Sequence, residues 1–323
     1  MTPGGPTHRG SGHRPRVLQR LVVGAAWLLS ACLAGDSPLP EPPPPPIGAA
    51  SLAPALTGGR TPLEMTWLEP AGDTRKTPVV LYSRLETTGG RRLWSPPSTV
   101  VTGADLFVNW ADFPSVTRTA AGTLLAHWLQ RSDKGTYSYD VQLARSTDQG
   151  ASWKPLGPLH ADGTASEHGF VSAVPEGDGV RVFWLDGRQT VPGSRREKDD
   201  PAPAVTAAAQ HGSRDPGDGT QERGAMSLRT AMVGTLISDR RLLDDRVCDC
   251  CQTAAVMTAA GPLVAYRDRS AAEIRDISII RATPDGWSAP VPIHADGWKV
   301  PGCPVNGPAV AADAGDPSRV AVA

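Results

Sequence analysis

The chain has 323 residues and a net charge of −1, with 32 basic and 33 acidic residues mixed along its length. This balance argues against a basic nucleic-acid-binding face and an acidic tail, so we expect no nucleic-acid partner. Gly (34) and Pro (32) are abundant whereas Phe and Tyr number 4 each, which is typical of many short strands joined by turns. The length allows one large domain or two average ones.

The first part of the chain predicts export. Arginines at positions 9, 14, 16 and 20 precede the apolar run 21–29, which is too short to span a bilayer. The run ends in Leu29-Ser30-Ala31-Cys32, which resembles a bacterial lipobox. The resemblance implies a signal peptide over 1–31, lipid on Cys32, and a membrane-anchored protein on the outer-membrane or periplasmic side of the envelope. The alternative is an ordinary signal peptide with an incidental cysteine.

A proline-rich stretch follows over residues 32–60, with five consecutive prolines at 42–46. Such a run cannot supply the hydrogen bonds of a helix or sheet and extends as polyproline II at roughly 3.1 Å per residue. We therefore expect a spacer here and place the folded domain at 61–323.

Within 61–323 a unit repeats, consisting of a loop, a strand, a small polar turn and a second strand. The second strands are predicted at 124–131, 180–188, 263–269 and 319–323. Arg131 and Arg188 are 57 residues apart, and Arg188 and Arg269 are 81 apart. The excess of 24 falls in a polar stretch at about 190–225, where we expect a disordered insertion.

Tryptophans followed by prolines give a second marker of the repeat, since Trp94, Trp153 and Trp287 each close the outer hairpin of a unit. A period near 57 residues with four strands per unit predicts a β-propeller. About four such units fit into the residues after 60.

One turn carries a more specific pattern, S-x-D-x-G-x-x-W, formed by Ser146, Asp148, Gly150 and Trp153. The Asp can accept bonds from backbone amides of its own turn, and Gly can take a positive φ. The pattern resembles the Asp-box, or bacterial neuraminidase repeat, of sialidase-like β-propellers. In that family the turn is structural and lies away from the active site. Because the family has six blades, we expect an all-β, sialidase-like propeller that is incomplete; a closed four-bladed propeller is the alternative.

Propeller topology places the loop before the first strand and the exit from the second strand of each unit on the same funnel face. Candidate ligand residues there are Asp112, Arg131, Glu167, Arg188, Arg267, Asp268 and Arg269, with His168, Asp186, Glu273 and Asn306 beside them. A ring of arginines suits an anionic ligand such as a sugar acid, because guanidinium binds carboxylate bidentately. The alternative is that these charges cap strand ends and pair with one another.

Sialidases use three arginines on the substrate carboxylate, a Tyr nucleophile activated by Glu, and an Asp acid/base. The family's Arg-Ile-Pro motif is missing between 52 and 108, and we expect all four tyrosines (82, 137, 139, 266) to pack within strands. No catalytic residue can therefore be assigned. Two hypotheses stay open: an exo-α-sialidase-type glycosidase acting on acidic glycans, or a non-catalytic propeller that binds glycan or protein. We expect a monomer without a cofactor.

With Cys32 lipidated, the four remaining cysteines are Cys248, Cys250, Cys251 and Cys303. An even number in an exported protein favours two disulfides of undetermined connectivity, and a bridge between the Cys248 cluster and Cys303 would join loops of adjacent blades. A thiolate site for zinc or cuprous copper and free redox thiols are the alternatives. His160 and His294 occupy the same slot after W-x-x-P, so we assign them to the repeat and expect no metal there.

Overall fold

The structure is a computed structural model that describes residues 43–58, 62–72, 76–191, 224–316 and 318–323. Residues Pro44–Ala323 form one compact unit. The expected signal peptide and Cys32 lie outside the described residues, as does most of the expected insertion.

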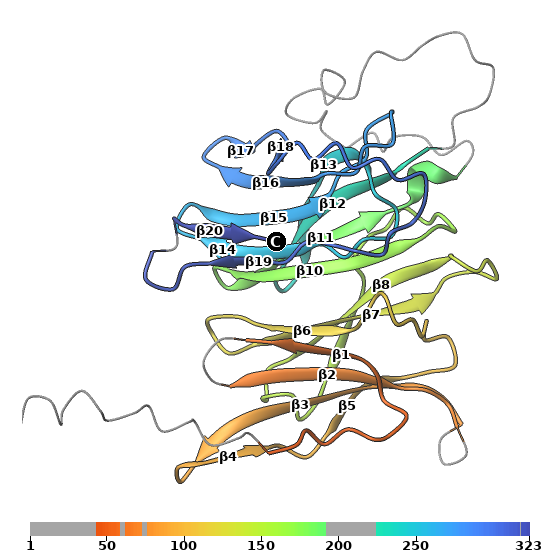
Figure 1. Ribbon diagram of the computed structural model, residues 1–323. Helices are drawn as coiled ribbons and strands as arrows, with labels where there is room; N and C mark the ends of the chain where they lie inside the picture. The colour runs from red at the N-terminus through yellow and green to blue at the C-terminus, as the bar shows by residue number, and fades with distance from the viewer. Residues whose placement is uncertain (1–42, 59–61, 73–75, 192–223, 317) are drawn as a thin grey trace, which may run out of the picture. The chain divides into compact units, whose positions relative to one another are not determined.

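The described chain is organised as successive antiparallel sheets, each built from strands that are consecutive in sequence (Figure 1). The first sheet contains β1 (Leu52–Thr57), β2 (Leu63–Glu69), β3 (Val79–Thr88), β4 (Arg91–Trp94) and β5 (Ser98–Thr102). The second contains β6 (Ser115–Arg118), β7 (Leu124–Arg131), β8 (Tyr139–Ser146) and β9 (Lys154–Pro158). The third contains β10 (His168–Glu176), β11 (Gly179–Asp186), β12 (Met226–Val233) and β13 (Ile237–Val247).

The fourth sheet contains β14 (Ala254–Thr258), β15 (Gly261–Arg267), β16 (Ile277–Thr283), β17 (Gly286–Trp287) and β18 (Val291–Pro292), and a two-stranded sheet follows with β19 (Val310–Ala312) and β20 (Val320–Val322). The single helix among the described residues is the 3₁₀ turn η1 (Arg188–Thr190). Among the described residues, no helix has the length and apolar character that crossing a membrane requires.

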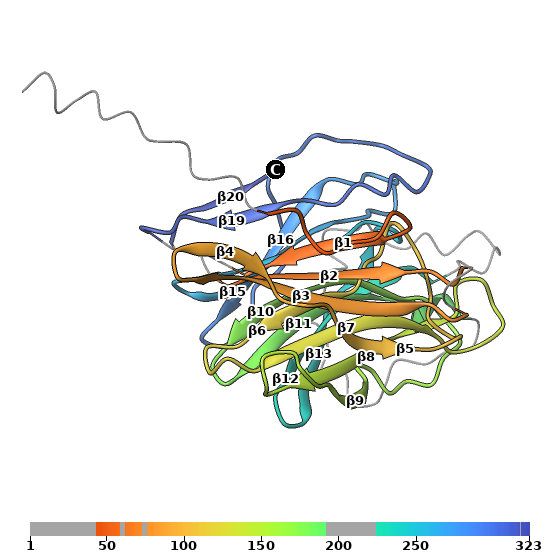
Figure 2. The ribbon, with the colours of Figure 1, turned by 90° about the horizontal axis from the view of Figure 1, so that it is seen from below.

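Apolar side chains alternate along the central strands because successive residues of a strand point to opposite faces. Tyr139, Val141 and Leu143 of β8, for example, are fully buried, whereas Asp140 and Gln142 between them are partly exposed. These buried faces meet between sheets. One cluster joins β8 to β10–β12, and a second joins β10–β13 to β15 and β16. Consecutive sheets therefore bury their faces against each other, which is the packing of a β-propeller. Figure 2 shows the strands of these sheets from below.

The turn after β8 has the hydrogen bonds expected from its sequence. Ser146 Oγ donates to Asp148 Oδ1 (2.7 Å), and the backbone amide of Ser152 donates to the same oxygen (2.9 Å). The Ser152 hydroxyl also donates to Asp148 Oδ2, and this bond, together with the other two, lowers the pKa of Asp148 to about 2. Gly150 has φ +83°, and a Cβ added to it would lie 2.1 Å from Cε1 of Tyr82 in the first sheet. The turn therefore packs directly on the neighbouring sheet.

The three repeated tryptophans are all partly buried against the core. Trp153 meets Tyr82 edge-on at 5.4 Å, and Trp287 meets Phe183 of the third sheet edge-on at 5.5 Å. Trp94 packs against the small cluster of the first sheet. All three tryptophans of the outer hairpins therefore contact apolar side chains of the core.

Two boundaries differ from the sequence prediction. Residues 52–57 were expected in the spacer, but they form β1, which pairs with β2. Tyr137 was expected in a strand, but it precedes β8 and is 64% exposed.

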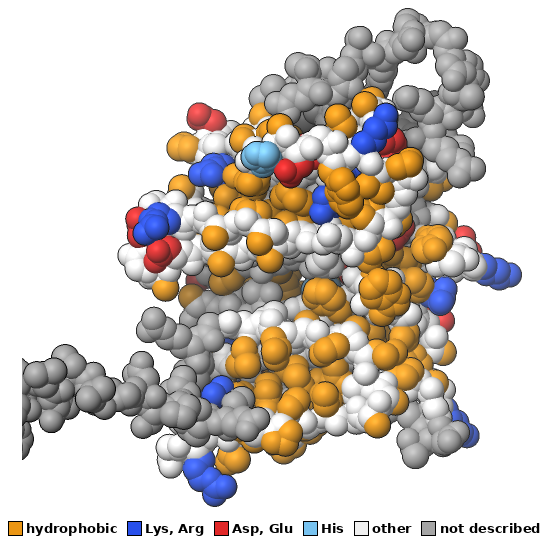
Figure 3. Space-filling view, in the orientation of Figure 1, with side chains coloured by type: hydrophobic (Ala, Val, Ile, Leu, Met, Phe, Trp, Pro, Cys, Tyr) orange, Lys and Arg blue, Asp and Glu red, His pale blue; other side chains and the backbone are white. Residues whose placement is uncertain are grey.

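The expected insertion connects β11 to β12, which pair directly with each other from Val180↔Val233 to Asp186↔Ser227. Hydrophobic side chains gather on the face seen in Figure 3; Leu56 of β1 and Val291 of β18 are among the exposed apolar residues.

Candidate functional site

An open depression of about 490 Å³ lies where the second, third and fourth sheets contribute loops to one place. Its lining includes Tyr137 before β8, Glu167 before β10, Thr190 of η1, Met226 at the start of β12 and Asp249 after β13. Three of these residues, Tyr137, Glu167 and Met226, precede or begin a strand, so the starts of strands in neighbouring sheets meet at this depression. Glu167 is the only one of the predicted ligand residues that lines this depression.

The Glu167 carboxylate is held from the protein side by Tyr139. The tyrosine hydroxyl donates to Glu167 Oε1 at 2.5 Å, and the tyrosine ring stacks on Phe107 at 4.1 Å. Burial raises the pKa of Glu167 above its usual range, and the charge of Asp249 adds to the rise. Burial also raises the pKa of Tyr139, whose side chain has no exposed surface. Tyr139 therefore positions Glu167 and cannot itself reach a ligand.

The second carboxylate at the depression, Asp249, is ion-paired. Arg269 Nη1 lies 3.0 and 2.8 Å from the two Asp249 oxygens, and Arg269 Nη2 lies 2.9 Å from Glu273 Oε1. The Asp249 side chain is 40% exposed. Two carboxyl groups in different environments thus border the same depression.

Asp112 lies behind this site and is almost fully buried. Its Oδ2 accepts a bond from the Phe170 amide at 2.6 Å, whereas Oδ1 has no hydrogen-bond partner among the described residues. Burial raises the pKa of Asp112 to about 8. The carboxyl can approach this closely because residue 169 is Gly, where an added Cβ would lie 1.9 Å from Asp112 Oδ2. The structure places Asp112 in the core, where a ligand cannot contact it.

The predicted arginines are bound to separate protein partners. Arg131 is exposed and lies over the Phe107 ring at 5.0 Å. Arg267 is 8% exposed, donates to the Asn306 and Arg275 carbonyls at 2.8 and 2.6 Å, and lies over Trp298. Arg131 therefore contacts an aromatic ring, and Arg267 contacts backbone carbonyls and an aromatic ring. Asp268 accepts a bond from Ser278 Oγ at 3.3 Å.

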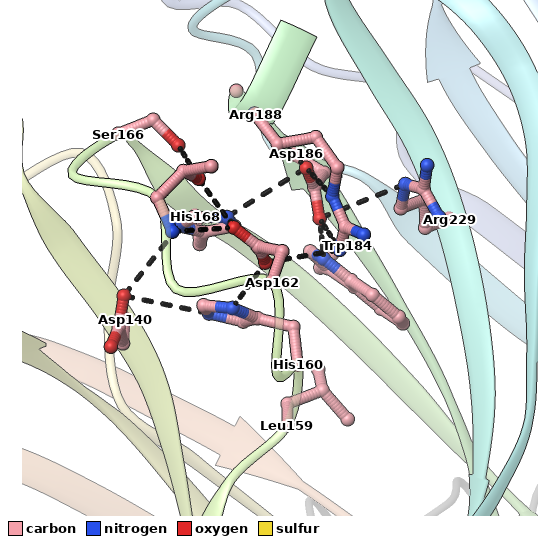
Figure 4. A network of polar contacts seen from close by, with 12 residues as sticks. Asp140, Leu159, His160, Asp162, Ser166, His168, Trp184, Asp186, Arg188 and Arg229 are labelled. Carbon is pink, nitrogen blue, oxygen red and sulfur yellow. Dashed lines mark hydrogen bonds and ion pairs between the residues drawn. The ribbon is translucent and has the colours of Figure 1, made fainter. Parts of the chain in front are cut away.

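A second charged group, centred on Asp162, is buried between the second and third sheets (Figure 4). Asp162 Oδ2 lies 2.8 Å from His160 Nδ1, 3.3 Å from His168 Nε2 and 3.1 Å from Arg188 Nη2. Asp186, at the end of β11, accepts bonds from Arg188 Nε and Trp184 Nε1 at 2.8 and 2.9 Å. Arg188 is therefore part of the buried core.

Charge is nearly balanced in this Asp162 cluster. It holds three carboxylates and two guanidinium groups: Asp162 and Asp186 pair with Arg188, Asp186 also lies near Arg229, and Asp140 lies near the imidazoles of His160 and His168. Burial lowers the pKa of His168, but its hydrogen bond to Asp162 and the nearby carboxylates outweigh burial and raise that pKa. The pKa of Asp162 is lowered, because bonds from His160 and His168 outweigh its burial. One imidazolium would complete the balance.

Three groups of described residues bring metal-ligating atoms within 4.8 Å of one another: Cys248, Cys250 and Cys251; Asp140, His160 and His168; and Asp162, His168 and Asp186. The histidine groups fit a metal poorly. The His160 and His168 rings stack at 3.6 Å with planes 15° apart, and a ring nitrogen of each lies within 3.3 Å of Asp162 Oδ2, so these nitrogens already face a protein carboxylate. The two arginines already supply cationic partners. We assign the Asp162 cluster to the folded core.

The sequence does contain a signal for this cluster, because His-Ala-Asp-Gly occurs twice, at 160–163 and 294–297. Assigning both histidines to the repeat alone leaves out the aspartates that follow them. Both copies form the same bond, since His160 Nδ1–Asp162 and His294 Nδ1–Asp296 both measure 2.8 Å. The second copy is exposed, with side chains 77% and 62% accessible. Burial of the first copy depends on His168 and Arg188 from the following sheet, which no local pattern shows.

Of the four cysteines expected in disulfides, Cys250 and Cys303 are bonded to each other. Cys248 and Cys251 are buried free thiols, with their sulfurs 3.3 Å apart.

The fold defines a β-propeller protein. No model of a known protein family matches the chain, and no curated protein matches it. Among solved structures it is similar to a Penicillium chrysogenum α-L-arabinanase complexed with arabinobiose, with TM-score 0.46 and 11% identity over 82% of this chain and 71% of that chain. It is also similar to a thermostable family-43 glycoside hydrolase, with TM-score 0.44 and 11% identity over 86% of this chain and 84% of that chain. A Fusarium graminearum α-L-arabinofuranosidase is similar with TM-score 0.38 and 10% identity over 87% of this chain and 90% of that chain. None of these matches singles out the sialidase-like family or assigns a residue.

Proposed function

We propose that the protein is a carbohydrate-acting propeller and that the depression bordered by Glu167 and Asp249 is its glycan site. The observation that carries the proposal is the pair of carboxyl groups there. The pKa of Glu167 is raised, as a general acid requires, and Asp249 is ion-paired with Arg269. Glycoside hydrolysis needs one carboxylic acid to protonate the leaving oxygen and one carboxylate to act as base or nucleophile.

The surroundings suit a sugar. Tyr137 is 64% exposed at the rim and offers a ring face to the apolar side of a pyranose or furanose. Tyr139 fixes the Glu167 carboxyl through the hydroxyl bond of 2.5 Å. In this proposal Glu167 donates the proton and Asp249 supplies the second carboxylate.

An acidic glycan, as an exo-α-sialidase would take, is the narrower form of the proposal and has less support. The arginines that would hold a sugar acid are engaged elsewhere, since Arg188 is buried on Asp186 and Arg267 on backbone carbonyls. Tyr139 is too buried to act as a nucleophile. A non-catalytic glycan-binding propeller is the second candidate, favoured by these occupied arginines.

A panel of fluorogenic glycosides that includes sialosides, arabinofuranosides and xylosides tests the proposal. Glu167→Gln should lower kcat on the hydrolysed substrate by about 100-fold or more. Glu86→Gln, on a 44% exposed carboxylate of the first sheet, should leave it unchanged. Activity that survives Glu167→Gln would refute the assignment. Absence of hydrolysis together with oligosaccharide binding that Glu167→Gln weakens would establish the binding function instead.

We also propose that lipid on Cys32 tethers the protein to the envelope. The apolar run 21–29 and the following Leu29-Ser30-Ala31-Cys32 support this. Cys32→Ser should move the protein from the membrane fraction to the soluble fraction and abolish incorporation of labelled fatty acid. An unchanged membrane fraction would contradict it.

A further inference from the structure

The cysteine group after β13 combines two thiols and one disulfide in a small volume. Cys248 and Cys251 are 0% and 1% exposed and follow the C-x-x-C spacing. The sulfurs of Cys248, Cys250 and Cys251 all lie within 4.8 Å of one another, and Cys250 is bonded to Cys303. A nucleophilic thiol is therefore already beside a disulfide.

The surroundings favour a thiolate at Cys248. Arg275 Nη1 lies 3.1 Å from Cys248 Sγ, and this guanidinium is 3% exposed. The Cys251 sulfur lies 3.3 Å from Cys248 Sγ, within hydrogen-bond distance. The Cys251 bond is the largest cause that lowers the pKa of Cys248, to about 6, while the pKa of Cys251 itself is raised. The thiolate is the form that attacks a disulfide.

The two ends of the disulfide differ in accessibility. Cys250 is 8% exposed and lies with the thiols, whereas Cys303 is exposed on the loop after β18. That loop is also held by the Arg267 bond to the Asn306 carbonyl at 2.8 Å, so its position does not depend on the disulfide alone.

We propose that these four cysteines form an internal thiol–disulfide exchange site. The Cys248 thiolate attacks Cys250 Sγ, the Cys250–Cys303 bond breaks, and Cys303 leaves as a thiolate that takes up the proton lost from Cys248. Cys251 then loses its proton and attacks Cys248 Sγ, and Cys250 leaves and is protonated. Two thiols and one disulfide are present before and after, so no outside oxidant is needed.

The exchange moves reducing equivalents from the core to the surface. The buried pair becomes the Cys248–Cys251 disulfide, and Cys303 becomes an exposed thiol. Cys303 can then react with a disulfide-containing partner, either a small molecule or a protein. Permanently buried thiols would show no such reactivity.

Differential alkylation of the full chain tests the proposal. The native protein is labelled with N-ethylmaleimide, then denatured and labelled with an isotopic form, and each cysteine is located by peptide mass mapping. We expect native labelling at Cys303, lowered at least tenfold in Cys248→Ser. Cys251→Ser should keep it, because the first exchange step needs only Cys248. Equal labelling of Cys303 in Cys248→Ser, or none in the unmodified chain, would overturn the proposal.

A second measurement on the unmodified chain guards against a variant that fails to fold. The rate of Cys303 labelling, corrected for the reagent's own pH dependence with a free thiol, should rise from pH 4 to about pH 6 and then level off. A corrected rate that does not change with pH would contradict a Cys248 nucleophile. Bound zinc without Cys303 labelling would favour a thiolate metal site and overturn the exchange.

Discussion

Replacing Asp162 by Asn should destabilise the protein strongly, because Asp162 is the shared acceptor of the buried cluster. Its Oδ2 lies within 3.3 Å of His160, His168 and Arg188, and the Asp162 and Arg188 side chains are 4% and 5% exposed. Asn is nearly isosteric, but an amide would turn N–H groups toward these donors or leave them unpaired. Removing one partner of a buried ion pair costs about 3–5 kcal/mol.

Asp296→Asn is the matched control, since it alters the same His-Ala-Asp-Gly sequence at an exposed copy. The His294–Asp296 distance is also 2.8 Å, but the side chains are 77% and 62% accessible. Exposed pairs contribute little, so we expect a change within about 0.5 kcal/mol.

Urea denaturation followed by tryptophan fluorescence measures both variants. With an m value of about 2–3 kcal/mol/M, the midpoint of Asp162→Asn should fall by about 1–2 M, while that of Asp296→Asn should barely move. Equal shifts in the two variants would refute the reasoning, because they would show that burial between sheets adds nothing to the local His–Asp bond.

The cost of Asp162→Asn should also depend on pH. The pKa of His168 is raised in the folded state, so His168 contributes to the free energy of unfolding below about pH 6.5, and this contribution is lost as pH rises through the folded-state pKa. The pKa values of Asp162 and Asp186 are lowered, so these carboxylates contribute to the free energy of unfolding above about pH 4, and their contribution is lost in acid. The loss should therefore be largest between about pH 4 and 6.5 and smaller, though not zero, at pH 9, where Arg188 stays charged.

Two further predictions follow from buried contacts. Gly150→Ala should destabilise by about 1–3 kcal/mol in urea denaturation, because its Cβ would lie 2.1 Å from the Tyr82 ring. Gly157→Ala, at φ +90° with nothing within 4 Å, measures the backbone strain alone, and an equal loss there would contradict a packing effect. Asp112 has its pKa raised to about 8, so it stabilises the fold at low pH and loses this contribution as pH rises toward 8. In urea denaturation, Asp112→Asn should reduce the fall in the free energy of unfolding between pH 4 and 8 by at least about 1 kcal/mol. If the free energy of unfolding of Asp112→Asn depends on pH as in the unmodified protein, the raised pKa of Asp112 is refuted.

The strands could be predicted because their signals are local. The second strand of the second unit, expected at 124–131, coincides with β7. Period-2 alternation and paired turn residues at 146–150 are enough to determine such elements. The first strand was missed because Pro54 and the preceding prolines indicate a spacer. In the structure Pro54 falls at the irregularity between Leu52 and Ala55, where the ladder with β2 is interrupted and no proline amide is needed.

The partners of the predicted site residues could not be read from the sequence. Topology indicated that Glu167 and Arg188 follow or precede strand ends on one face, but not that Arg188 lies 3.1 Å from Asp162 in the loop between β9 and β10. Nor did it indicate that Asp249, placed among the cysteines, would border the depression beside Glu167. Sequence position fixes the strand end, while the side chain's partner depends on the packing of the next sheet.

The proposed glycan site and the proposed exchange site meet at Asp249, which lies between Cys248 and Cys250. Exchange changes which sulfurs anchor the backbone on either side of this carboxylate, while the Arg269 contacts at 2.8 and 3.0 Å hold its side chain. The two proposals can still fail separately. Cys248→Ser removes the exchange nucleophile but keeps Glu167 and Asp249, so hydrolysis that persists in Cys248→Ser and is lost in Glu167→Gln would establish the carboxylate pair without the cysteines. Cys303 labelling that depends on Cys248, in a chain that hydrolyses no glycoside, would establish the exchange without the enzyme.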